Sequence, residues 1–148
     1  INGGLAFAYI SGQLVGAVLG TFIAHARFGL TFLQLSTTER AGANLWLAEA
    51  VATFGLIFAI LGTLRWKSDA VATVVGLYIL SAYWFTASTS FANPAVTIAR
   101  SLTDTFSGIA TSGLLAFILA QLFGAVLAAL VCKWLFASQI TERKSSSL

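Results

Sequence analysis

Four long runs of apolar residues constrain this chain more strongly than any other feature of its sequence. They lie at about 5–24, 45–64, 70–88 and 112–136, and only 9% of the residues are charged. A helix of ~20 apolar residues crosses the hydrocarbon core of a bilayer, whereas soluble domains carry about 25% charged residues. The sequence therefore predicts an all-α membrane protein whose four runs each span the lipid bilayer.

The few basic residues predict how these spans are oriented. Lys and Arg cluster in the connector at 65–69 and in the segment after 136, and cytoplasmic loops carry an excess of these residues. We therefore expect a cytoplasmic tail at 137–148, an external loop at 25–43 and a multi-pass location in the plasma (inner) membrane. Because the charges lie at span ends, the net charge of +3 gives no reason to expect nucleic acid as a partner.

An internal repeat relates the first and last spans. "YISGQLVGAVL" at 9–19 aligns with "FILAQLFGAVL" at 117–127, so that Gln13 matches Gln121. Repeats in membrane proteins often form two halves of inverted topology, yet nothing in front of the first copy corresponds to the long block that precedes the second. The chain also contains no methionine. We therefore expect two further spans, and a segment like 86–102, upstream of Ile1.

The segment "TASTSFANPAVTIAR" predicts a helix that begins inside the membrane. Asn93 suits the N-cap and Pro94 the first helical position. A helix from there to about 102 would rise only ~13 Å, which is about half of the hydrocarbon core. The hydroxyl-rich residues before it read as irregular chain, which is tolerated at this depth only where protein buries it or it lines a watery cavity. We expect a re-entrant loop and half-helix at about 86–102.

Such a half-helix offers the chemistry of a pore. Its N-terminus carries free N–H groups and a positive partial charge, which favour acceptor oxygens of a solute and repel protons and cations. We expect Asn93, Pro94 and Ala95 at the pore. Carbonyl groups of the preceding segment would add acceptors on the same wall: Ser88, Thr89 and Ser90. The alternative, an N-cap in a surface loop, is disfavoured between two spans.

Glu49 is an acidic residue inside the second span, where a charge indicates function by default. It would act either in proton coupling or as a structural acceptor for N–H groups of the loop. No second acid or histidine lies in a neighbouring span to relay a proton, which favours the structural role. His25 is predicted to be an interface residue, and we expect no metal, no cofactor and no enzymatic activity.

These features together resemble the aquaporin (major intrinsic protein) family. The resemblance rests on "FANPAVTIAR", on "AEAVATFGL" with its Glu, and on the two "QLxGAVL" helices. It covers nearly the whole chain, as the third to sixth spans of a six-span channel. The resemblance implies an aquaporin-like helical bundle with Asn93 at the pore midpoint and Glu49 bracing the re-entrant loop. It also implies a homotetramer with one pore per subunit and small neutral solutes as passengers.

Two departures from the family pattern bear on selectivity. The family usually has Arg directly after the second Asn-Pro-Ala, where this chain has Val96; Arg100, one helical turn further, would lie ~6 Å outward in the vestibule. The filter position on the preceding span is Ser81 rather than histidine, and Ser90 would be the contribution of the loop. A wide, uncharged filter implies glycerol-like polyols and neutral metalloid acids such as arsenite, as in the bacterial aquaporins associated with arsenic-resistance operons.

Two other functions stay open at this stage. A secondary transporter with a broken helix would need a coupling residue in the membrane, for which Glu49 is the candidate. A truncated, non-conducting remnant of a channel is the other alternative.

Overall fold

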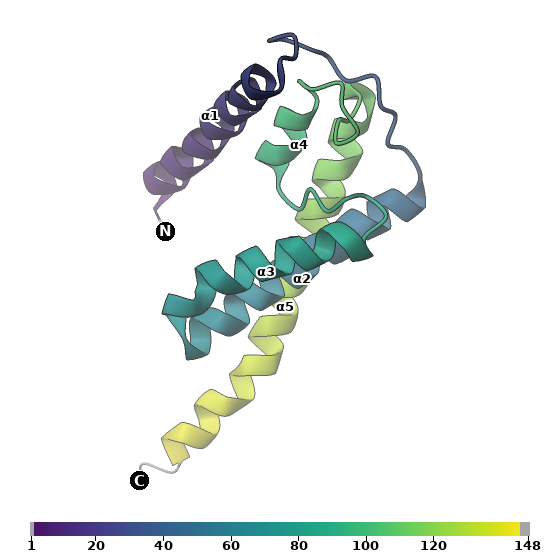
Figure 1. Cartoon of the computed structure of the whole chain (residues 1–148). Helices are drawn as coiled ribbons and strands as arrows, with labels where there is room; N and C mark the ends of the chain where they lie inside the picture. The colour runs from purple at the N-terminus through teal and green to yellow at the C-terminus, as the bar shows by residue number, and fades with distance from the viewer. Residues whose placement is uncertain (1, 146–148) are drawn as a thin grey trace.

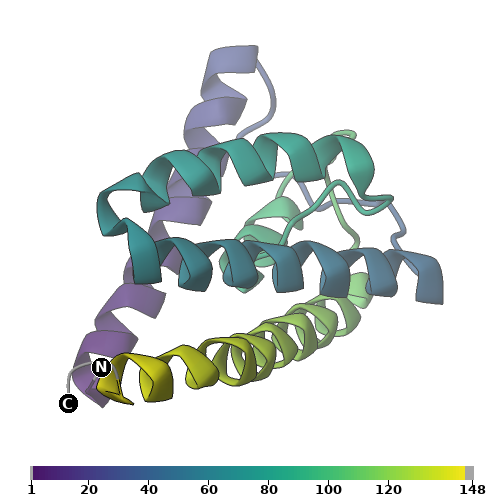
Figure 2. The same cartoon turned by 90° about the horizontal axis from the view of Figure 1, so that it is seen from below.

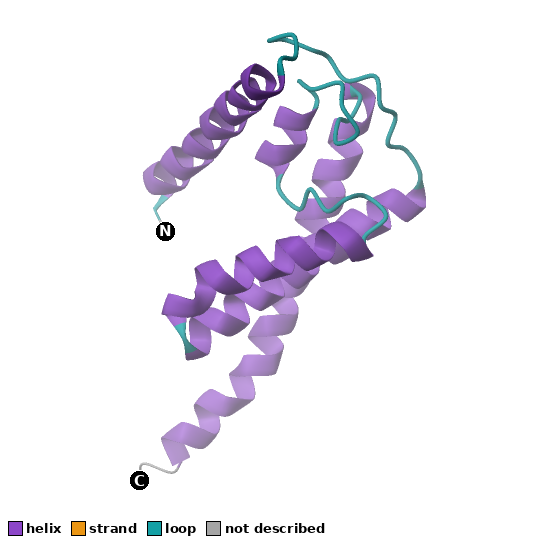
Figure 3. Ribbon diagram, in the orientation of Figure 1, coloured by secondary structure: helices purple, strands orange, loops and turns teal. Residues whose placement is uncertain are grey.

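The computed structural model describes the backbone of residues 2–145 and the side chains of residues 2–137. These residues form only helices and loops (Figures 1 and 3). The elements, in chain order, are α1 (Gly3–Phe28), α2 (Ala43–Trp66), the short η1 (Ser68–Ala70), α3 (Val71–Phe85), α4 (Pro94–Arg100), the short η2 (Thr111–Gly113) and α5 (Leu114–Ser145). The described chain is thus all-α, as predicted.

Four of the helical segments are long and apolar enough to cross a membrane. They are Gly3–Phe28, Ala43–Trp66, Ser68–Phe85 and Thr111–Ala137. The first two extend beyond the runs read from the sequence. The third ends at Phe85 rather than at 88, because Thr86 adopts an extended conformation (φ −101°, ψ 136°) that no α-helix contains.

The last helix, α5, continues beyond the expected end of its span at 136. The candidate span ends at Ala137, next to the expected limit at 136, and α5 continues as one helix to Ser145 through part of the expected tail at 137–148. Residues 146–148 of that expected tail lie outside the described part of the chain. The sequence after 136 is polar but lacks Pro and Gly, so nothing in it ends the helix.

Burial in this structure is inverted relative to a soluble domain. The fully buried side chains include several that are polar, whereas large apolar side chains face outward on all four long helices. The buried polar group comprises Glu49, Ser88, Thr97 and Gln121. The exposed apolar group includes Phe7, Phe28, Trp84 and Trp134. A helix surface of this kind is compatible with the hydrocarbon core of a bilayer, where polar groups need hydrogen-bond partners inside the protein.

Close packing of α2 on α5 forms the centre of the bundle, with α3 against the other side of α2 (Figure 2). The contact is close because Gly124 of α5 lies directly on the backbone of Ala50. Small residues at such crossings let helices approach in membranes. Of the helices described, α1 packs only against α4, and Figure 1 shows it standing apart from α2, α3 and α5.

The long loop at 29–42 is docked onto the loop at 101–110, beyond the C-terminal end of α4. Ser36 N donates to Ser101 O at 2.9 Å, and Ala110 N donates to Thr38 O at 2.7 Å. The Asp104 carboxylate accepts from both N and Oγ1 of Thr37. The loop therefore forms an ordered cover over one end of the half-helix.

The close contact at Gly124 generates a prediction about stability. A Cβ there would overlap the carbonyl oxygen of Ala50, and overpacking of this kind costs ~1–3 kcal/mol. We expect Gly124→Ala, made in the natural-length protein, to lower the midpoint of thermal unfolding in detergent, followed by tryptophan fluorescence. Gly76→Ala is the matched control, because nothing lies within 4 Å of a Cβ at that position. Equal midpoints for the two variants would contradict the α2–α5 packing.

Candidate functional site

The half-helix α4 begins at the residues that the sequence indicates. Asn93 is the extended N-cap, and its Oδ1 accepts from Ala95 N at 2.8 Å. Pro94 occupies the first turn, where its missing N–H leaves no donor unpaired. The helix contains 7 residues and ends at Arg100, two residues before the expected limit at 102. A helix of this length rises only ~10 Å.

The loop before α4 is strained. Thr89, Ser90 and Ala92 have φ angles of 65°, 51° and 50°. Left-handed backbone costs non-glycine residues roughly 1–2 kcal/mol each, so it persists only where the surroundings hold it. The loop therefore needs firm anchors at the very residues that lead into Asn93.

Glu49 of α2 is the first of these anchors. Its side chain has no solvent exposure. Oε1 accepts from Ser88 Oγ at 2.6 Å and from Phe91 N at 2.9 Å. Oε2 accepts from Ala92 N at 3.0 Å. A carboxylate that accepts backbone N–H groups in a low dielectric makes strong, charge-assisted hydrogen bonds, which fix the strained turn.

The two glutamines of the internal repeat both reach α4, from opposite sides. Gln121 Nε2 donates to Glu49 Oε2 at 2.7 Å and to Thr97 Oγ1 at 2.8 Å. Asn93 Nδ2 donates to Gln13 Oε1 at 3.2 Å. The half-helix is thus linked to α5 by the hydrogen bond between Thr97 and Gln121, and through Gln121 to Glu49 of α2. Its N-cap residue Asn93 links it to α1.

Arg40 is a second anchor of the loop. Its guanidinium is buried and donates to three carbonyl oxygens, those of Gly108 at 2.7 Å, Phe106 at 2.8 Å and Ser88 at 3.2 Å. Burial lowers the pKa of Arg40 from its ordinary value, and the nearby Glu49 opposes this shift. Arg40 lies in the 25–43 loop that the sequence analysis expects to be external, but its anchoring role was not predicted.

The contact with Arg40 changes the reading of Ser88. Its carbonyl was expected to line a pore, but Ser88 is fully buried and this oxygen accepts from Arg40. Of the three carbonyl groups considered, those of Thr89 and Ser90 stay candidates. The Ser90 hydroxyl is buried and has no hydrogen-bond partner among the described residues.

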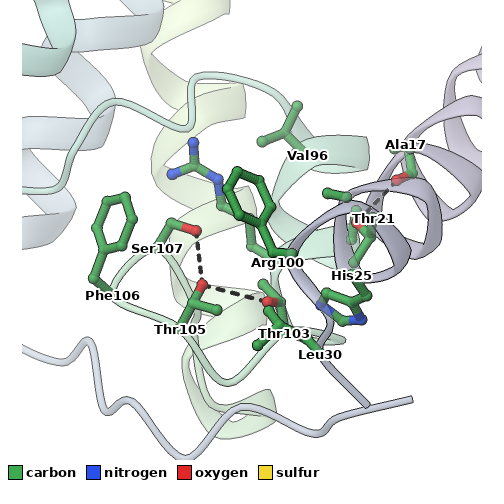
Figure 4. A pocket seen from close by; sticks show the side chains of 14 residues that line it. Ala17, Thr21, His25, Leu30, Val96, Arg100, Thr103, Thr105, Phe106 and Ser107 are labelled. Carbon is green, nitrogen blue, oxygen red and sulfur yellow. Dashed lines mark hydrogen bonds between the residues drawn. The ribbon is translucent and has the colours of Figure 1, made fainter. Parts of the chain in front are cut away.

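A cavity of about 680 Å³ lies between α1 and the outer half of α4 (Figure 4). Val96 and Arg100 line it from α4, and the 103–107 segment lines it with a row of hydroxyl groups. In that row Thr105 Oγ1 lies 3.3 Å from Thr103 Oγ1 and 3.2 Å from Ser107 Oγ. Ser81 and Ser90 do not line this cavity; Ser81 is exposed on α3 and donates to Leu77 O.

Two further positions depart from or refine the sequence reading. His25 was predicted to lie at the interface, but it is buried in the wall of the cavity, with Nδ1 3.0 Å from Phe32 O. The Arg100 side chain turns back along α4, so that Nη1 donates to Thr89 Oγ1 at 3.3 Å. Among the described side chains, residues 2–137, no group of three His, Cys, Asp or Glu residues is arranged to hold a metal ion.

The chain belongs to the major intrinsic protein family, whose sequence profile matches residues 34–147. The family indicated by the motifs is thereby confirmed. A curated relative, the "Aquaglyceroporin AqpS" of Rhizobium meliloti (strain 1021), is 52% identical over 128 residues, which cover 86% of this chain and 55% of the relative. The chain therefore spans about half the length of that relative. No solved structure matches it.

The hydrogen bonds of Glu49 generate a prediction for Glu49→Gln. An amide NH₂ in place of either oxygen would face the backbone N–H of Phe91 or of Ala92, so one buried donor loses its acceptor. Losing a buried hydrogen bond to a charged group costs ~1.5–3 kcal/mol. We expect faster proteolysis within the 86–93 loop and a lower unfolding midpoint in detergent.

Glu39→Gln is the matched control, since Glu39 is exposed and lies in the neighbouring loop. Wild-type proteolysis and stability in Glu49→Gln would show that the carboxylate does not hold the loop.

Proposed function

We propose that this protein is a passive membrane channel for water and small neutral solutes such as glycerol-like polyols. One observation carries the proposal: α4 begins among apolar helices and is held there by buried polar side chains of α2 and α5. A helix end at that depth is tolerated only where protein buries it or a watery passage accompanies it. Its positive N-terminus favours the acceptor oxygens of solutes and repels protons and cations.

The filter that we propose consists of Ser81, Ser90 and Val96. Val96 replaces the arginine that is usual after this motif, which widens the constriction and admits solutes larger than water. Neutral metalloid acids such as arsenite belong to the same class of small, hydroxyl-bearing molecules. The name of the Rhizobium meliloti relative supports glycerol-type solutes.

The arrangement in the membrane is part of the same proposal. We propose a multi-pass protein of the plasma (inner) membrane with the C-terminus in the cytoplasm, as the positive residues at 65–69 and beyond 136 favour. By resemblance to the family we propose a homotetramer, with a second half-helix supplied by residues upstream of Ile1. Asn93 would then lie at the middle of the pore, facing its counterpart.

Transport by rocking halves is the main rival function, and the surroundings of Glu49 argue against it. A coupling carboxylate must exchange protons or ions with water, whereas Glu49 has no solvent exposure and both of its oxygens accept hydrogen bonds from the loop and from Gln121. This environment favours the channel.

Stopped-flow light scattering tests the channel directly. Proteoliposomes with the natural-length protein should swell in an inward glycerol gradient faster than empty liposomes, without any ion gradient or membrane potential. Addition of an ionophore should leave this rate unchanged. Glycerol flux that requires a proton or sodium gradient would favour the transporter, and absence of water and solute flux would favour the non-conducting remnant.

Val96→Arg tests the filter assignment. A guanidinium at the first turn of α4 would narrow the passage and add a charge, so we expect glycerol flux to fall at least about tenfold while water flux falls much less. Val96→Leu is the control for side-chain size without charge. An equal loss of water and glycerol flux in Val96→Arg would contradict the placement of Val96 at the constriction.

A further inference from the structure

The side chain of Arg100, the last residue of α4, extends back toward the start of that helix. Nη1 donates to the Thr89 hydroxyl at 3.3 Å. The guanidinium carbon lies 4.2 Å from the centre of the Phe91 ring, close enough for a cation–π contact. Thr89 and Phe91 flank Ser90, the proposed loop residue of the filter. The charge thus lies beside the loop that leads into Asn93.

Arg40 contacts the same ring but differs from Arg100 in its hydrogen bonding. The guanidinium carbon of Arg40 lies 5.2 Å from the ring centre of Phe91, and three of its nitrogens donate hydrogen bonds to carbonyl oxygens. Arg100 has one hydrogen-bonded side-chain acceptor among the described residues, Thr89. A guanidinium carries five N–H donors, so Arg100 keeps donors for other partners.

The side chain of Arg100 also lines the cavity that Val96 lines (Figure 4). No carboxylate of the described residues forms an ion pair with it. The same cavity is lined by the hydroxyl row of the 103–107 segment. A fixed positive charge and a row of hydroxyl groups therefore line the same cavity. This combination can hydrogen-bond neutral, oxygen-rich molecules and opposes the approach of cations.

We propose that Arg100 is the residue that determines charge selectivity in this channel, in place of the arginine absent at position 96. This inference rests on the proposed channel function. Reaching back from one turn beyond Val96, the guanidinium supplies the repulsion of cations and protons without narrowing the passage at Val96. Solutes too large for an arginine-lined filter are then admitted, while charge exclusion is kept.

Charge-neutralising variants of the natural-length protein in proteoliposomes test this role. Arg100→Gln removes the charge and keeps a donor for Thr89, and Arg100→Lys keeps the charge. The readouts are glycerol flux and the rate at which a proton gradient decays, with valinomycin and potassium present to prevent a counter-potential. We expect Arg100→Gln to raise the proton leak roughly tenfold, and Arg100→Lys to exclude protons as the wild-type protein does. Glycerol flux, measured in parallel, shows whether each variant still forms a channel.

Arg27→Gln is the matched control, because Arg27 is an exposed arginine at the end of α1 and does not line the cavity. Normal proton exclusion in Arg100→Gln with glycerol flux retained would overturn the inference and leave the channel standing. Wild-type protein without passive glycerol flux would instead refute the proposed function. Loss of glycerol flux in both Arg100 variants, without a leak, would assign Arg100 a structural role only.

A chemical rescue covers the case in which Arg100→Gln does not fold. Arg100→Cys is modified in the folded state with a cationic or an anionic methanethiosulfonate reagent; Cys132, the only cysteine of this chain, is buried. We expect the cationic adduct to restore proton exclusion and the anionic adduct to leave the leak. The same leak with both adducts would contradict a role for the charge.

Discussion

The buried carboxylate of Glu49 is the interaction on which the candidate site depends. It accepts from Phe91 N and Ala92 N, two backbone donors of a loop that no regular structure pairs. In an apolar interior an unpaired backbone N–H costs several kcal/mol, and three residues of the loop also adopt left-handed backbone. Together with the local cap formed by Asn93 and Pro94, this acceptor stabilises the non-helical segment between the end of α3 at Phe85 and the start of α4 at Pro94.

The position of α4 follows from side chains that converge on it from several helices. Gln121 carries the Glu49 contact onward to Thr97, one turn into α4, while Gln13 holds the Asn93 amide from α1. The close α2–α5 packing at Gly124 brings Gln121 within reach of the carboxylate. A short helix that is marginal in isolation therefore gains its stability from tertiary hydrogen bonds rather than from its own length.

Local sequence patterns predicted the parts of the site that depend on local physics. Asn93 and Pro94 marked the start of α4 because capping and proline stereochemistry act within one turn. Glu49 stood out because a charge in an apolar run needs partners. The contact between Arg40 and Ser88 was not predicted, because it joins residues 48 positions apart, which no local pattern encodes. The early end of α3 was missed as well, because the extended conformation of Thr86 leads into a loop that side chains from distant parts of the sequence hold.

Arg40 and Arg100 both contact the ring of Phe91, but their guanidinium groups differ in their hydrogen bonds. Arg40 donates hydrogen bonds to three carbonyl oxygens, two in the 101–110 loop and one in the loop before α4. Arg100 gives one hydrogen bond to a hydroxyl and lines a cavity. The number of hydrogen bonds that the protein itself makes to each guanidinium, rather than its nearness to Phe91, therefore distinguishes the structural anchor Arg40 from Arg100, for which we propose a role in selectivity.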